Sequence, residues 1–150
     1  MRERFDKKLL FAHFQRRHPM FIVDKGLKKL IDQDILQITV DDEYPPFDPS
    51  KQIGPSTIDL RLSRIFRRYK PEVDTIDLTQ EKETEIIELA LDGELAIQPG
   101  ELILGLTVEI IRLPANISGL TAARSSIARL GLSVGEQTLI HPGYTGSVAL

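Results

Sequence analysis

Apolar residues recur at every second position between residues 102 and 110. The five residues are Leu102, Leu104, Leu106, Val108 and Ile110. Successive side chains of an extended strand point to opposite faces, so a period of two indicates a β-strand, whereas a helix repeats about every 3.6 residues. This pattern is the clearest in the chain, and it predicts a fold built around a sheet.

Shorter patterns elsewhere extend the same prediction. Apolar and polar residues also alternate over 58–62, which predicts a second strand. Asp92-Gly93 stands between two apolar segments and predicts a β-hairpin. Pro99-Gly100 and Pro142-Gly143 predict turns. Short strands separated by turns are typical of a β-sandwich or barrel, so we expect a mainly β fold.

The N-terminal part of the chain predicts helices instead. Residues 1–20 are expected to be an N-terminal extension with an amphipathic helix that docks on the rest of the chain. Contact of this helix with a membrane surface or a nucleic acid is the alternative. A second helix is predicted over 25–33, with Asp24 as its N-cap. Residues 21–150 are predicted to form one domain.

Composition excludes several kinds of site and partner. The 150 residues include no cysteine, so disulfides, thiol catalysis and cysteine-ligated zinc are excluded. A net charge of −3 argues against a nucleic-acid polymer as partner, because duplex binding relies on basic residues. No apolar run approaches the ~20 residues of a membrane span, and the first residues lack a secretory h-region. We therefore expect a soluble, cytoplasmic protein with no membrane partner.

One short segment places cations and hydroxyl groups together. Arg124 and Arg129 flank Ser125 and Ser126, and Gly131 follows them. Guanidinium groups, hydroxyls and the N–H groups at the start of a helix all suit a polyphosphate. Taken alone, the same pattern fits an exposed, capped helix equally well, so both interpretations stay open.

The context of this segment carries a family resemblance. Ile53–Leu62, which contains Asp-Leu-Arg-Leu, lies upstream, and Ile140-His-Pro-Gly-Tyr-Thr-Gly146 lies downstream. In this order and spacing the chain resembles the dCTP deaminase branch of the dUTPase superfamily. The resemblance implies a dUTPase-like distorted β-barrel or jelly roll with one or two N-terminal helices. It also implies a homotrimer whose active sites are shared between subunits.

The resemblance further implies a reaction. Enzymes of this family convert dCTP to dUTP and ammonia, in pyrimidine deoxynucleotide synthesis, when a carboxylate-activated water attacks C4 of the cytosine. Mg²⁺ accompanies the triphosphate, and no zinc is used. Three alternatives stay open: a dUTP pyrophosphatase, a bifunctional deaminase and dUTPase, and a non-catalytic nucleotide-binding relative or truncated remnant.

Residue roles follow from the same resemblance. Ser125 matches the serine that hydrogen-bonds the nucleophilic water, and Arg129 matches the arginine that supports this water and the carboxylate. These two are the predicted catalytic residues, and no residue is predicted to bind a metal. The predicted substrate-binding residues are Arg124, which matches a phosphate-contacting arginine, Ser126, His141, Gly143 and Tyr144.

The chain also departs from the family pattern. His141 stands where deaminases have the Asp that binds the sugar 3′-hydroxyl, and Tyr144 stands where they often have Trp. The chain ends within a strand expected to begin at Ser147, so we expect it to be the front part of a longer protein or a split fragment. The family's general-base Glu would follow Leu150, and without it we expect the 150 residues alone not to deaminate dCTP at a useful rate. Glu136 is a poor substitute, because a loop Glu is usually just solvated.

Two groups of charged residues lie in or near the Asp-Leu-Arg-Leu segment, and for each group two interpretations stay open. Asp59 and Arg61 are interpreted first as a structural pair at the start of the barrel, and second as neighbours of an adjacent subunit's site. A basic cluster is either a solvated strand face or a patch that faces phosphate. Its members are Arg61, Arg64, Arg67, Arg68 and Lys70.

Overall fold

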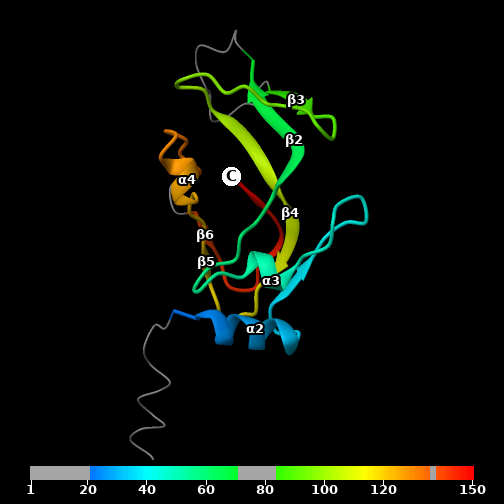
Figure 1. The fold of residues 1–150 in the computed structure, drawn as a ribbon, viewed down its shortest axis with the longest axis vertical. Helices are drawn as coiled ribbons and strands as arrows, with labels where there is room; N and C mark the ends of the chain where they lie inside the picture. The colour runs from blue at the N-terminus through cyan, green and yellow to red at the C-terminus, as the bar shows by residue number, and fades with distance from the viewer. Residues whose placement is uncertain (1–20, 71–83, 136–137) are drawn as a thin grey trace, which may run out of the picture.

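The computed structural model describes residues 21–70, 84–135 and 138–150 (Figure 1). Its helices are α2 (Asp24–Asp32), α3 (Pro49–Gln52) and α4 (Ser125–Ala128). Its strands are β1 (Gln37–Thr39), β2 (Leu62–Tyr69), β3 (Thr84–Glu88), β4 (Ile103–Arg112), β5 (Gly119–Leu120), β6 (Leu139–Ile140) and β7 (Thr145–Ala149). The prediction of a mainly β fold is confirmed. The helix expected within residues 1–20 and the loop residue Glu136 lie outside the described residues.

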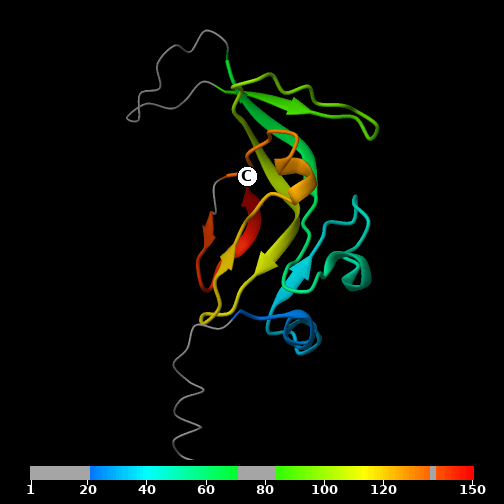
Figure 2. The same cartoon turned by 60° about the vertical axis from the view of Figure 1, so that its left-hand side comes forward.

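The predicted central strand is confirmed as β4, and the main sheet is built on it. The sheet has the order β1-β4-β2-β3, and β7 also pairs with β4; all these pairs are antiparallel. The sheet curls like half a barrel, with α2 across one end (Figures 1 and 2). A second, two-stranded sheet of β5 and β6 lies beside β7 in both views.

The hydrophobic core lies where α2 meets the C-terminal half of β4. Burial of apolar surface is the main favourable contribution to folding, and it is concentrated here. The buried side chains come from α2, the segment after it, β4 and its end, β6 and β7: Leu27, Leu36, Ile111, Leu113, Ile140 and Val148.

The N-terminal half of β4 turns its leucines outward. Leu104 and Leu106 are exposed, whereas the opposite face, with Gly105 and Thr107, is buried. Phe66 of β2 lies opposite Gly105 and covers it, because a Cβ at residue 105 would lie only 3.2 Å from the Phe66 ring. The outward face continues across three strands. Arg67 of β2 also lies on it, between Ile86 and Leu104 in the strand register. The apolar members of this face, Ile65, Ile86, Leu104 and Leu106, are 39% to 66% exposed, and we name them the apolar face.

Two predicted strand features are wrong. The Asp92-Gly93 turn forms, with Gly93 N–H donating to Ala90 O at 3.0 Å, but residues 94–97 are not a strand. β3 pairs with β2 instead, and Arg68 of β2 binds the Ala96 carbonyl at 3.1 Å. The strand expected over 58–62 also fails. Asp59 N–H donates to the Gln52 carbonyl of α3, Ile58 forms only an isolated bridge with Ile53, and β2 begins at Leu62.

The predicted helix over 25–33 is confirmed as α2, but its cap differs from the prediction. Val23 is the N-cap residue, without a side-chain bond, and Asp24 lies in the first turn. There Asp24 pairs with Lys28 at 2.7 Å, which is the i,i+4 arrangement that stabilises helices. None of the helices in the described ranges is both long and apolar enough to cross a bilayer.

Candidate functional site

The α4 helix is a single turn that carries the paired serines between two arginines. Arg124 is its N-cap residue, and the Arg124 carbonyl accepts from the Ile127 and Ala128 N–H groups at 2.9 and 3.0 Å. Gly131, with a φ of +84°, ends the turn in a conformation that favours glycine. The two serines and both arginines are exposed. One turn has only a small dipole, so the positive charge here comes from the arginine side chains.

Asp59 joins the upstream segment to this turn. Its carboxylate lies 3.5 Å from the guanidinium of Arg124. The two residues are far apart in the sequence, so the fold brings the Asp-Leu-Arg-Leu segment and the α4 turn together. The expected pairing of Asp59 with Arg61 is not found in the described residues, because Arg61 binds a different carboxylate, that of Glu109, at 2.7 Å.

Glu109 is a fully buried carboxylate that the sequence analysis did not identify. Its Oε1 accepts from Gln52 Nε2 at 2.8 Å and from Arg61 Nε at 2.7 Å, and its Oε2 accepts from the Arg61 N–H at 2.8 Å. Burial alone would raise the pKa of Glu109. The bonds from Arg61 and Gln52 outweigh burial and hold this pKa below its usual value. The folded structure therefore favours the charged form of the Glu109 carboxylate.

The turn at residues 141–144, which we name the His141 turn, carries the other predicted binding residues. Tyr144 N–H donates to the His141 carbonyl at 3.2 Å, and Gly143 has a φ of +77°, as the third residue of a type II turn requires. His141 is exposed. Tyr144 is half-buried against the core, and its hydroxyl donates to the Ser147 carbonyl at 2.6 Å.

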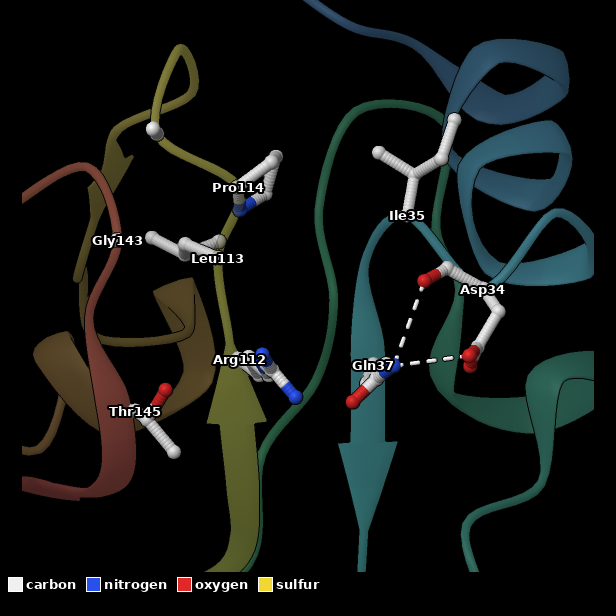
Figure 3. A pocket seen from close by; sticks show the side chains of 9 residues that line it. Asp34, Ile35, Gln37, Arg112, Leu113, Pro114, Gly143 and Thr145 are labelled. Carbon is white, nitrogen blue, oxygen red and sulfur yellow. Dashed lines mark hydrogen bonds between the residues drawn. The ribbon is translucent and has the colours of Figure 1, made fainter.

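Gly143 also lines a cavity of about 430 Å³ between β1, β4 and the start of β7 (Figure 3). Arg112 extends from β4 toward Gln37, whose amide donates to the Asp34 carboxylate at 2.9 Å (Figure 3). The residues of the α4 turn are not among those that line this cavity. The cavity and the turn with the paired serines are thus different places.

The predicted site residues fall into two groups at opposite ends of the β5–β6 pair. Gly119 pairs with Ile140, and Thr121 binds Thr138 through both backbone and side chain. In an antiparallel pair the chain leaves the two strands at opposite ends, so α4 follows β5 at one end and the His141 turn follows β6 at the other. Figure 2 shows α4 beyond one end of this pair and the segment that joins β6 to β7 at the other end.

The described residues include no group of three or more His, Asp or Glu side chains that could hold a metal ion. The hydroxyls and cations of the α4 turn can instead bind an anionic, phosphate-bearing ligand. Arg124, one cation of this surface, pairs with Asp59 at 3.5 Å.

Comparisons with known proteins bear on this site. A family model described as dCTP deaminase-like matches residues 21–150. The dUMP-forming dCTP deaminase of Dictyoglomus thermophilum is 34% identical over 136 residues, covering 87% of this chain and 68% of the relative. The dCTP deaminase of Glaesserella parasuis is 35% identical over 144 residues, covering 87% of this chain and 71% of the relative.

A solved structure also matches the fold. The crystal structure of 2′-deoxycytidine 5′-triphosphate deaminase from Agrobacterium tumefaciens aligns with a TM-score of 0.56 and 24% identity. The match covers 85% of this chain and 39% of that chain. The expected dUTPase-like architecture is consistent with this likeness.

Proposed function

Because this chain belongs to the dCTP deaminase-like family, we propose that the protein hydrolyses dCTP to a deoxyuridine nucleotide and ammonia. The family match across residues 21–150 carries this proposal. The α4 turn, with two hydroxyls between two guanidinium groups, supplies the chemistry that a triphosphate and an attacking water need. The product is dUTP, as the sequence resemblance implies, or the dUMP for which the Dictyoglomus relative is named. Either nucleotide feeds pyrimidine deoxynucleotide synthesis in the cytoplasm.

The residues of the α4 turn have different roles in the proposed reaction. Arg124 neutralises charge on the triphosphate, with Ser126 beside it as a hydrogen-bond donor. Ser125 orients the water whose oxygen attacks C4, and Arg129 supports that water as its proton passes to a carboxylate base. Glu109 is not this base, because it is fully buried and both of its carboxylate oxygens accept hydrogen bonds from Arg61 or Gln52.

The substrate is the Mg²⁺ complex of the triphosphate. Mg²⁺ keeps several waters and is commonly bound through substrate phosphates, so the metal arrives with the nucleotide. No zinc takes part, since the chain has no cysteine and the water is activated by a carboxylate. His141, Gly143 and Tyr144 contact the nucleoside part of the substrate.

The site is completed in a homotrimer. The α4 turn and the His141 turn leave the β5–β6 pair at opposite ends, so one subunit does not bring the two groups together. The apolar side chains of the apolar face are exposed around Arg67 in the single chain, and exposed apolar side chains grouped on one face are typical of protein interfaces. The first observation supports sites made from the α4 turn of one subunit and the His141 turn of its neighbour, and the second supports association of subunits.

The test is product analysis with the protein purified from its complete reading frame. Incubation with Mg²⁺ and dCTP should deplete dCTP and release dUTP and ammonia, separated by ion-exchange chromatography. Accumulation of dUMP and pyrophosphate would assign the bifunctional reaction instead. Hydrolysis of added dUTP without any loss of dCTP would contradict the proposal.

A further inference from the structure

Arg124 has one ionic partner in the described part of the chain. This side chain is 72% exposed, and its guanidinium lies 3.5 Å from the carboxylate of Asp59. A free arginine side chain samples many rotamers, so a ligand that binds it has to bear the entropy cost of ordering it. A carboxylate that restrains the guanidinium before the ligand arrives reduces this cost.

Gln52 forms hydrogen bonds with both the N–H and the carbonyl group of Asp59. The Asp59 N–H donates to the Gln52 carbonyl at 2.7 Å, and Gln52 Nε2 donates to the Asp59 carbonyl at 2.9 Å. Gln52 is buried, and its Oε1 accepts from the Asp48 N–H at 3.0 Å. The position of the Asp59 backbone is therefore fixed by α3.

Gln52 is fixed in turn by a buried charge. Its Nε2 also donates to Glu109, which Arg61 binds through both its N–H and its guanidinium. A second link runs from β4 to β7: the Thr107 hydroxyl donates to the Glu109 carbonyl at 2.8 Å and accepts from the Val148 N–H at 2.9 Å. We name Glu109, Gln52 and Arg61 the Glu109 cluster.

We propose that the Glu109 cluster holds Asp59 as a positioning residue, whose carboxylate orients Arg124 for the triphosphate. This inference rests on the proposed function, in which Arg124 binds phosphate. Asp59 does not have to touch the substrate, because it acts through Arg124.

Asp59 could affect triphosphate binding in two ways: its negative charge could repel the ligand, or its carboxylate could position Arg124. A carboxylate beside a triphosphate site repels the ligand, so its removal should tighten binding if charge alone matters. If Asp59 positions Arg124, its removal should weaken binding. The two accounts predict opposite signs for the same Asp59→Asn variant.

The experiment measures the dissociation constant of Mg²⁺-dCTP by calorimetry in a Ser125→Ala background, where turnover is slow. Asp59→Asn should raise this constant roughly threefold, the range of one exposed ion pair. In the otherwise unchanged protein it should raise KM similarly and leave kcat within about twofold. Glu43→Gln is the matched control, since it removes an exposed pair with Arg64 at 3.3 Å and should change neither.

A double-mutant cycle tests whether Asp59 affects nucleotide binding through Arg124. Asp59→Asn should have no further effect on the dissociation constant once Arg124 is replaced by Ala, because the two residues then act as one unit. An unchanged or lower dissociation constant in Asp59→Asn, or additive effects in the cycle, would overturn the proposal. Absence of deamination by the unchanged protein, with weaker nucleotide binding in Asp59→Asn, would reject the proposed function and keep the positioning role.

Glu109→Gln tests whether the Glu109 cluster contributes to the position of Asp59 and Arg124. The variant that remains folded by circular dichroism should bind Mg²⁺-dCTP as weakly as Asp59→Asn does. Wild-type affinity in this folded variant would show that the Glu109 cluster does not act on Arg124. If the variant does not fold, Asp59→Asn and the cycle still decide the role of Asp59.

Discussion

The two arginines of α4 have different surroundings, although both are exposed. Arg124 faces a carboxylate, whereas Arg129, at the other end of the turn, makes no ion pair in the described residues. A guanidinium restrained by one carboxylate is ready to bind an anion through its other N–H groups. This difference agrees with a binding role for Arg124 and a role beside the water for Arg129.

Substitutions in the α4 turn should separate binding from turnover. Arg124→Ala should raise KM for dCTP roughly 10- to 100-fold, because a charge-assisted bond to phosphate is lost in ground and transition states alike. Ser125→Ala and Arg129→Ala should lower kcat by about 10²-fold or more with smaller changes in KM. Steady-state kinetics of the three variants measures this, and an equal loss of kcat in Arg124→Ala would count against the assignment.

Glu109 gives the fold a pH dependence of known sign. Its pKa in the folded protein lies below the ordinary value of 4.5, so folding is favoured most when the carboxylate is charged in both states. The stabilisation is complete above the unfolded value and is lost as the pH falls through the folded value. Denaturant unfolding of wild type and Glu109→Gln should differ by about 3 kcal/mol or more at pH 7. This difference should shrink below pH 4.5, and a constant difference would contradict the ionised pair.

Among the elements, β4 shows what a sequence pattern can predict and what it cannot. The period of two identified β4 correctly, because alternation depends only on local backbone geometry. It did not show which face is buried, since that depends on Phe66 of β2 and on β7, which lie far away in the sequence. Glu109 was missed for the same reason: a polar residue in an alternating strand is normally assigned to the solvent side.

The other errors also come from long-range contacts. Asp92-Gly93 predicted the turn but not the partner of β3, which is β2. The α4 turn and the His141 turn were recognised as motifs, yet their places at opposite ends of the β5–β6 pair depend on the antiparallel pairing of β5 with β6, which was not predicted. Motif order in a sequence therefore predicted the candidate residues but not their grouping.

The close approach of Phe66 to Gly105 gives a prediction for β4. A methyl group at residue 105 would lie 3.2 Å from the Phe66 ring, so Gly105→Ala should destabilise the protein by about 1 kcal/mol or more. Phe66→Leu in the same chain should recover part of this loss, because the smaller side chain leaves room. Thermal unfolding of the single and double variants measures the coupling, and strictly additive losses would show that the two residues are not in contact.

For the whole molecule, the proposed homotrimer can be tested at the apolar face. We expect light scattering to give the mass of three subunits at micromolar concentration. Ile86→Lys places a charge on the apolar face and should shift the mass toward one subunit with loss of activity. Leu91→Lys, at a turn residue that is 83% exposed, is the control and should leave the trimer intact. A stable, active monomer would contradict both the trimer and the shared sites.

Deamination at the α4 turn is the central claim, and ammonia release from Mg²⁺-dCTP measures it most directly. The comparison needs three forms of the protein: unchanged, Ser125→Ala, and Ser133→Ala, which removes an exposed hydroxyl outside the turn. The unchanged protein and Ser133→Ala should release one ammonia for each dCTP consumed, at equal rates. Ser125→Ala should release ammonia about 10²-fold more slowly. Equal rates in all three forms, or no ammonia from the unchanged protein, would contradict the assignment.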